Sequence, residues 1–314
     1  MRPPVLLFIV GVVAALAIAS ALYSFTQTPD LSAQPGLPQH SIARTTAVLN
    51  RSQDVRPGDS HVTLTFQGDT RSYDLHVPPQ YDGKTPLPLV FVFHSLGGDA
   101  AAIANSTGFN AKADAEGFFV VYPQGLNNSW NAGTCCGASS EHNVDDVGFV
   151  KTLLAQLRSE LAVNDSRVYA AGGSNGGMLA YRLACDLSDD IAAIAPVGAT
   201  SVVERCNATA PVSVIAVHGT ADELIPYSEG TRGEGAFPVP PAVSAVSSWA
   251  QRDGTGEPWY HGEGNLTVTT YGGGINGTDV VLYTLNGGRH VWPTEIPTTD
   301  LIWRFFAMHP RVRA

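Results

Sequence analysis

Short continuous apolar runs, separated by segments with helical spacing, constrain the fold of this chain more than any other feature. Five such runs occupy residues 89–93, 118–122, 168–171, 191–196 and 212–217. Uninterrupted runs of this length are typical of parallel strands that are covered by helices on both faces. Between two of them, residues 145–161 place Phe149, Leu153 and Leu157 on one face of a helix. The alternation predicts an α/β fold with a mostly parallel, doubly wound sheet and helices on both faces.

Further elements are expected around these runs. Residues 61–66 and 72–77 alternate between apolar and polar side chains, which predicts an antiparallel pair of strands at one edge of the sheet. Helices are expected at residues 175–187, 242–252 and 300–308. The sequence contains no internal repeat and no sign of a second domain, so we predict a single domain over residues 59–314.

The first residues differ from the rest of the chain. Arg2 precedes an apolar run that ends in Ala19-Ser20-Ala21, which indicates a secretory signal peptide over residues 1–21. Because the run is nearly long enough to span a bilayer, an uncleaved signal anchor is the alternative. Residues 22–58 are rich in Ser, Thr, Gln and Pro and are expected to form a flexible linker. The chain is therefore predicted to be secreted, or anchored to the outer face of the membrane.

The cysteines agree with export. The chain has an even number of them, Cys135, Cys136, Cys185 and Cys206, as is common in an oxidising compartment. A bond between the adjacent Cys135 and Cys136 would be strained. We therefore expect one of these two to pair with Cys185 and the other with Cys206, with buried free thiols as the alternative.

Net charge and motif content restrict the classes of ligand and cofactor that this chain is expected to bind. The chain carries 18 Lys and Arg against 28 Asp and Glu, a formal net charge of −10. An acidic chain is a poor ligand for nucleic acid and for anionic membranes, and no stable protein partner is implied. The sequence has neither a His/Cys cluster with metal-ligand spacing nor a phosphate-binding glycine loop. We therefore expect neither a metal nor another cofactor.

A nucleophile motif follows the third of the five runs. Gly172-Gly173-Ser174-Asn175-Gly176 is a G-x-S-x-G sequence between an expected strand and an expected helix. In that context Ser174 is the predicted nucleophile, exposed on a sharp turn. The N–H of Asn175, at the start of the helix, is a predicted oxyanion donor.

The partners of a nucleophilic serine follow in the expected order. Asp222 comes just after the apolar run 212–217, and His290 comes just after a further strand expected at 280–285. In an open α/β sheet the carboxyl ends of the strands share one edge, so both side chains are expected beside Ser174. His218 is expected to brace the loop that carries the acid.

The second oxyanion donor is expected after the run 89–93. There the sequence reads His94-Ser95-Leu96-Gly97-Gly98, and its glycines allow backbone amides to approach a carbonyl oxygen. The N–H of Leu96 is the predicted partner of the Asn175 N–H, with Ser95 as the alternative.

Several motifs together resemble the secreted polyhydroxybutyrate depolymerase and feruloyl/acetylxylan esterase family. The resemblance covers roughly residues 60–310 and rests on Tyr122-Pro-Gln-Gly, Ser129-Trp-Asn-Ala-Gly-Thr-Cys-Cys-Gly, Val144-Asp-Asp-Val-Gly-Phe, Gly173-Ser-Asn-Gly-Gly-Met and His218-Gly-Thr-Ala-Asp. It implies the α/β-hydrolase fold and a catalytic triad of Ser174, Asp222 and His290. It also implies that Trp130 and Trp292 line an acyl or aromatic pocket, unless both are core residues.

Two positions depart from the family pattern. Ser95 stands where the family usually has glycine, which predicts a tighter or shifted oxyanion hole. Arg289 places a charge beside the predicted base, either for an anionic substrate or simply in solvent.

The sequence predicts a secreted serine carboxylic ester hydrolase of the feruloyl esterase or polyhydroxybutyrate depolymerase type, acting on a small-molecule or polymer-derived ester. A serine peptidase of the prolyl-oligopeptidase type and a non-catalytic surface binding protein are the alternatives.

Overall fold

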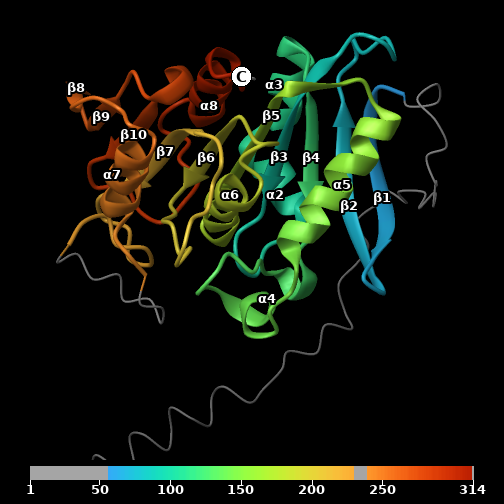
Figure 1. The fold of residues 1–314 in the computed structure, drawn as a ribbon, viewed down its shortest axis with the longest axis horizontal. Coiled ribbons are helices and arrows are strands. Elements are labelled where there is room, and N and C mark those ends of the chain that lie inside the picture. Colours follow the sequence, from blue (N-terminus) through green and yellow to red (C-terminus); the bar gives the residue numbers. More distant parts are fainter. Residues whose placement is uncertain (1–55, 230–238, 313–314) are drawn as a thin grey trace, which may run out of the picture. The chain divides into compact units, whose positions relative to one another are not determined.

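One mixed sheet organises the domain (Figure 1). The computed structural model describes residues 56–229 and 239–312. Within them, ten strands lie in the order β1-β2-β4-β3-β5-β6-β7-β10-β9-β8. Their bounds are β1 Gly58–Phe66, β2 Asp69–Val77, β3 Leu87–Phe93, β4 Phe119–Pro123, β5 Val163–Gly173, β6 Ala193–Val197, β7 Ser213–Gly219, β8 Trp259–Glu263, β9 Leu266–Tyr271 and β10 Val280–Leu285.

The centre of the sheet is parallel and its edges are antiparallel. Strands β4, β3, β5, β6, β7 and β10 run parallel to one another, whereas β1 and β2 close one edge and β9 and β8 the other. Strands β4, β6 and β7 are buried at every position, as continuous apolar strands covered on both faces should be. The predicted α/β class and the predicted edge pair of strands are confirmed.

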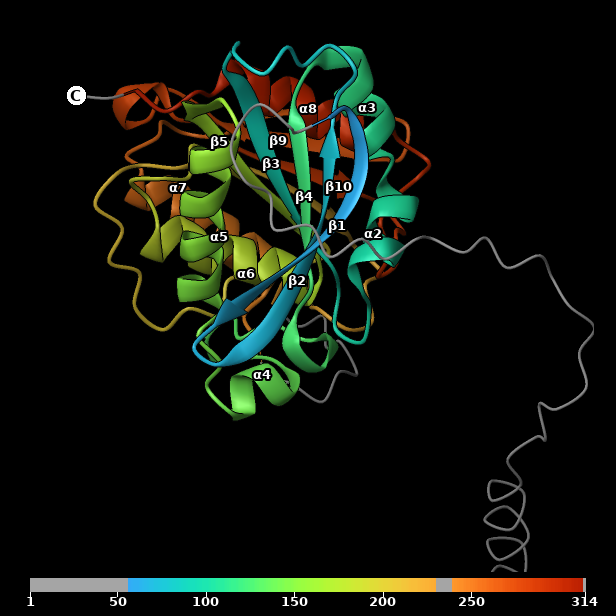
Figure 2. The same cartoon turned by 90° about the vertical axis from the view of Figure 1, so that its right-hand side faces the viewer.

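Helices cover both faces of the sheet (Figure 2). Helices α5 (Asp146–Glu160), α6 (Asn175–Asp186) and α7 (Ala242–Arg252) pack into one core cluster, with side chains such as Phe149, Met178 and Trp249. Helices α2 (Ala100–Thr107), α3 (Phe109–Glu116) and α8 (Thr298–Met308) pack into the other. Helix α4 (Gly137–Glu141) and the 3-10 turns η1 (Leu126–Asn128) and η2 (Ile275–Gly277) lie in connections.

Helix α5 shows how the local sequence sets an element. The carboxylate of Asp145 accepts a hydrogen bond from the N–H of Gly148 at 2.8 Å and so caps the helix. Phe149, Leu153 and Leu157 recur at helical spacing and are all buried. Asp146 lies in the first turn, where the positive end of the helix dipole favours an acidic side chain.

The structure differs from expectation at the edges. The hairpin β8–β9 was not expected from the sequence, because β8 is exposed at all its positions and carries no apolar pattern. Strand β1 already begins at Gly58, the last residue of the expected linker. The expected signal peptide and nearly all of that linker lie outside the described residues.

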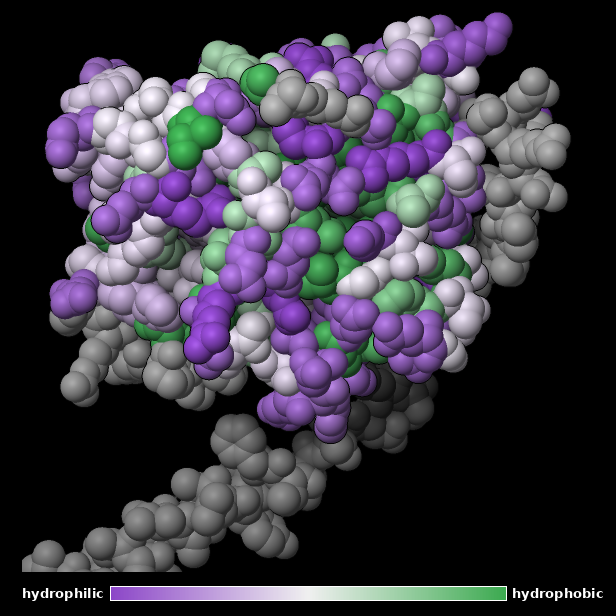
Figure 3. Space-filling view, in the orientation of Figure 1, coloured by the Kyte–Doolittle hydropathy of each residue, from purple (hydrophilic) through white to green (hydrophobic). Residues whose placement is uncertain are grey.

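The surface is mixed in character. In the orientation of Figure 1, hydrophobic residues reach this face as separate patches among hydrophilic ones (Figure 3). Among residues 56–229 and 239–312, no helix combines the length and apolar character that crossing a membrane requires.

Candidate active site

The predicted nucleophile lies at the junction of β5 and α6. Ser174 adopts a φ of 51° and a ψ of −120°, a strained conformation that is characteristic of a nucleophile on a sharp turn. A Cβ atom on Gly176 would collide with the carbonyl oxygens of Phe93 and His94. Glycine there lets the first turn of α6 lie directly against the end of β3.

The predicted acid and base are hydrogen bonded to each other. Oδ2 of Asp222 lies 2.8 Å from Nδ1 of His290 and 3.2 Å from Nε2 of His218. The other carboxylate oxygen, Oδ1, accepts the N–H groups of Leu224 at 2.9 Å and Ile225 at 2.8 Å. Burial alone would raise the pKa of Asp222, but these hydrogen bonds outweigh it and hold the pKa well below its ordinary value. Asp222 is therefore a buried, fully ionised carboxylate.

Backbone hydrogen bonds join the loops of the acid and the base. The N–H of Ala221 donates to the carbonyl oxygen of Gly288 at 2.9 Å, and the N–H of Thr220 donates to that of Leu285 at 2.9 Å. A Cβ atom on Gly219 would overlap the backbone of Gly288, so only glycine allows this close approach. The distance from Asp222 to His290 is thus set by the backbone of both loops.

The end of β6 connects the nucleophile to the acid–base pair. The N–H of Ser174 donates to the carbonyl oxygen of Val197 at 2.8 Å. The next residue, Gly198, has a φ of +55°, and a Cβ atom there would lie 3.5 Å from Nδ1 of His290 and 3.7 Å from Oδ2 of Asp222. The predicted nucleophile is thus bonded to Val197, and the predicted acid and base lie near the next residue, Gly198.

Two hydrogen bonds fix the peptide group between Ser95 and Leu96 in the loop after β3. The carbonyl oxygen of Ser95 accepts hydrogen bonds from Nδ1 of His94 and from the N–H of Gly98, both at 2.9 Å. In a trans peptide the N–H of Leu96 points opposite to that carbonyl. Among the described residues no partner accepts a hydrogen bond from the N–H of Leu96 or of Asn175. Both N–H groups are thus unpaired within this part of the chain.

His94 supports this loop, a role that sequence reasoning missed. Its Nε2 accepts the N–H of Gly125 at 3.0 Å, so the ring proton lies on Nδ1 and is donated to Ser95. Burial lowers the pKa of His94, which keeps the ring neutral. The only sequence signal is its position, at the end of a buried strand and directly before Ser95. The hydroxyl of Ser95 itself donates to the carbonyl oxygen of Gly173 at 3.2 Å.

The two tryptophans occupy different environments. Trp130 has no exposed surface and packs edge-to-face against Phe93. Of the two roles expected from the sequence, the structure therefore favours a core residue over the lining of an open pocket. Trp292 is partly exposed and lies beside Gly173. It also lines a hollow of ≈ 490 Å³ between the segments 106–115 and 293–300.

Arg289 is paired with a carboxylate. Its guanidinium lies 2.6 Å from Oε1 of Glu223, the residue that follows the acid, and this hydrogen bond lowers the pKa of Glu223. Its side chain is 74% exposed. Of the two roles expected from the sequence, the structure favours a solvated one.

Within the described ranges, no group of three or more His, Cys, Asp or Glu side chains is arranged to hold a metal ion.

The cysteine pairing expected from the sequence is wrong. Cys185 bonds to Cys206, with their Cα atoms 4.9 Å apart, and Cys135 bonds to Cys136. The physical reason is position along α6. Cys136 contacts Met178 in the first turns of that helix, whereas Cys185 lies seven residues on, about 10 Å further along the axis.

The sheet and the helices on both of its faces define the α/β-hydrolase fold. A solved acetyl xylan esterase from Aspergillus awamori shares this fold, with a TM-score of 0.62 and 14% identity, over 79% of this chain and 99% of that one. Residues 71–243 match the family profile described as Esterase PHB depolymerase, and the chain belongs to that family.

Named relatives agree with this assignment. The protein NocK of Nocardia uniformis subsp. tsuyamanensis is 30% identical over 253 residues, which is 73% of each chain. Feruloyl esterase B of Piromyces equi is 30% identical over 68% of this chain and 41% of that longer protein. Feruloyl esterase C of Emericella nidulans is 25% identical over 75% of this chain and 83% of that protein. The chain is a carboxylic ester hydrolase.

Proposed function

We propose that the protein is a secreted serine esterase with a triad of Ser174, His290 and Asp222. The Ser174 hydroxyl attacks the ester carbonyl while His290 takes its proton and then passes it to the departing alcohol. Asp222 holds His290 in one tautomer and stabilises its protonated form. The N–H groups of Asn175 and Leu96 bind the oxyanion. Water, activated by His290, then releases the acid from Ser174.

One observation carries this proposal. The buried Asp222 carboxylate is hydrogen bonded to His290, and both side chains lie near Gly198, the residue after the one that accepts the Ser174 N–H. An acid that orients a base, next to a serine on a strained turn at a helix N-terminus, is the arrangement that acyl transfer needs.

The substrate class follows from the relatives and from the hollow beside Trp292. We infer that feruloyl esters, acetylated sugars or short hydroxyalkanoates are cleaved. Two relatives are named as a feruloyl esterase and an acetylxylan esterase, and the family profile is described as a PHB depolymerase. Trp292 lies beside Gly173 of the nucleophile turn and also lines the hollow. The other walls of the hollow carry small, hydroxyl and charged side chains, so it can receive a polar part of the substrate. Export, with residues 1–21 removed as a signal peptide or kept as an anchor, belongs to the same proposal.

The experiment compares hydrolysis of p-nitrophenyl acetate, butyrate and octanoate and of methyl ferulate by the wild type and by Ser174→Ala. Ser159→Ala is the matched control, because Ser159 is exposed on α5. We expect turnover to vanish in Ser174→Ala alone, and the ranking of esters to give the size of the acyl site. Turnover by Ser174→Ala would contradict the proposal. Cleavage of peptide anilides but not of esters would favour the peptidase, and the absence of any turnover would favour a binding protein.

A further inference from the structure

The side chain of Asn175, next to the nucleophile, is held by the backbone of a single residue. Its Oδ1 accepts the N–H of Trp130 at 2.7 Å, and its Nδ2 donates to the carbonyl oxygen of Trp130 at 3.0 Å. All of these groups are buried. This pair of hydrogen bonds fixes the side chain of Asn175, whose own backbone N–H is one of the two proposed oxyanion donors.

Trp130 also reaches the loop of the other proposed donor. Its indole Nε1 donates to the carbonyl oxygen of His94 at 3.0 Å, and its ring lies 4.8 Å from the imidazole of His94. His94 in turn bonds to the carbonyl of Ser95 and so orients the N–H of Leu96. One buried residue is therefore bonded to both sides of the proposed oxyanion hole.

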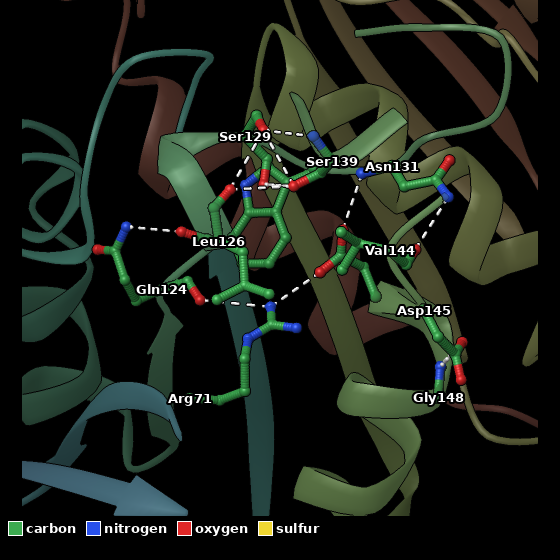
Figure 4. A network of polar contacts seen from close by, with 12 residues as sticks. Arg71, Gln124, Leu126, Ser129, Asn131, Ser139, Val144, Asp145 and Gly148 are labelled. Carbon is green, nitrogen blue, oxygen red and sulfur yellow. Dashed lines mark hydrogen bonds and ion pairs between the residues drawn. The ribbon is translucent and has the colours of Figure 1, made fainter. Parts of the chain in front are cut away.

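The residue after Trp130 is anchored at both ends. The N–H of Asn131 donates to Oδ2 of Asp146 at 2.8 Å, and its carbonyl oxygen accepts Nη1 of Arg182 at 2.7 Å. The side-chain amide of Asn131 donates to the carbonyl oxygen of Val144 at 2.9 Å (Figure 4). The other oxygen of Asp146 is 2.8 Å from Nη2 of Arg71, and both side chains are buried.

We propose that Trp130 is a positioning residue that sets the relative placement of the Asn175 and Leu96 amides, with Asp146 and Arg71 holding its segment in place. The inference rests on the proposed function, because it assumes that these two amides bind the oxyanion. Since a displacement of about 1 Å at a reacting centre can cost up to about 100-fold in rate, a loosened brace acts on the transition state more than on substrate binding.

The test compares Trp130→Phe with Trp249→Phe. Both changes remove a buried indole N–H that donates to a backbone carbonyl, because Nε1 of Trp249 donates to Val212 at 2.8 Å. Val212 lies at the amino-terminal end of β7, whereas Asp222 follows the carboxyl-terminal end of that strand. The readouts are kcat per titrated active site, KM, and the affinity for a trifluoromethyl ketone, whose tetrahedral adduct places an oxyanion in the hole.

We expect Trp130→Phe to lower kcat by about 10- to 100-fold, to change KM by less than about threefold, and to weaken inhibitor binding in parallel with kcat. Trp249→Phe should lower thermal stability and leave all three quantities near the wild-type values. Loss of stability in Trp130→Phe with kcat within about twofold of wild type would overturn the proposal and leave Trp130 as a core residue only.

Asn175→Ala provides the second measurement, and it decides the matter if Trp130→Phe does not fold. This variant keeps the backbone N–H of residue 175 and loses both bonds to Trp130, so the same fall in kcat and inhibitor affinity is expected. Ser174→Ala distinguishes a failure of this inference from a failure of the proposed function. If it abolishes turnover while Trp130→Phe and Asn175→Ala retain kcat, only this inference fails. If it retains turnover, the inference fails together with the proposed function.

Discussion

The carboxylate of Asp222 lies 2.8 Å from Nδ1 of His290, across the gap between the loops that follow β7 and β10. Its remaining acceptor positions are filled by His218 and by two backbone N–H groups. The carboxylate is therefore oriented by four donors and is ionised well below neutral pH. Such an anion stabilises a protonated imidazole, which is the role proposed for Asp222 beside His290.

Replacing this anion should affect catalysis far more than folding. Asp222→Asn keeps the shape of the side chain but removes the charge. Because the N–H groups of Leu224 and Ile225 hold the remaining oxygen, an NH2 donor replaces the acceptor that faces Nδ1 of His290. We expect kcat to fall by about 10³- to 10⁴-fold in steady-state hydrolysis of p-nitrophenyl butyrate. Asp279→Asn is the control, because Asp279 also bonds a histidine, His309 at 3.0 Å, outside this site. A loss of less than tenfold in Asp222→Asn would contradict the assigned role.

The ion pair of Arg289 with Glu223 predicts a small effect on activity. Arg289 is exposed, and its guanidinium already has a carboxylate partner. Exposed ion pairs contribute little, so Arg289→Gln should change kcat/KM by less than about threefold. The change should be equal for a neutral ester and for an anionic ester of similar size. A selective loss with the anionic ester would instead assign Arg289 to substrate binding.

The disulfide between Cys185 and Cys206 should stabilise the fold. It closes a loop with a sequence separation of 21, which on the chain-entropy model corresponds to roughly 3 kcal/mol. The double variant Cys185→Ser with Cys206→Ser should therefore melt about 5 to 12 °C below wild type in a thermal scan.

Peptide mapping without reduction tests the pairing itself. We expect a crosslinked pair of peptides that contain Cys185 and Cys206. A peptide with Cys135 or Cys136 linked to either of them would restore the pairing expected from the sequence.

Asp253 predicts a pH dependence of stability. Burial raises its pKa to about 6, against the opposing effect of Arg252, so the folded state holds a proton that the unfolded state releases near pH 4. The contribution of Asp253 to the free energy of unfolding is therefore greatest below pH 4. It decreases by about 3 kcal/mol in total as the pH rises to about 6.

Asp253→Asn isolates this effect because it does not titrate. The free energy of unfolding of wild type minus that of the variant, measured in urea at pH 4, 5, 6 and 7, should fall over this range and level off above about pH 6. A difference that is flat or rises with pH would contradict a raised pKa at Asp253.

Local patterns were sufficient to predict most of the fold. Continuous apolar runs marked the buried strands, because a strand covered on both faces has no polar side to show. The same logic failed for β8, which is exposed at every position and is defined only by its pairing with β9. The contact between Asp222 and His290 was predictable because each residue follows a recognisable strand, and the carboxyl ends of parallel strands meet at one side of the sheet.

Relationships through space were not predictable. The cysteine pairing depends on where Cys136 and Cys185 lie along α6, and a list of cysteines does not contain that distance. Trp130 looks the same in the sequence whether it lines a pocket or lies in the core. Its burial, and its bonds to His94 and Asn175, arise from the packing of three segments that are far apart in the chain.

Covalent trapping tests most directly whether Ser174 is the nucleophile. The purified protein is treated with a p-nitrophenyl phosphonate, which transfers its phosphonyl group to an activated serine and releases p-nitrophenolate, and the intact mass and the peptide map are recorded. We expect one phosphonyl group per chain, on Ser174, with complete loss of esterase activity and no adduct in Ser174→Ala. An adduct on another residue, or full activity after Ser174 is modified, would contradict it.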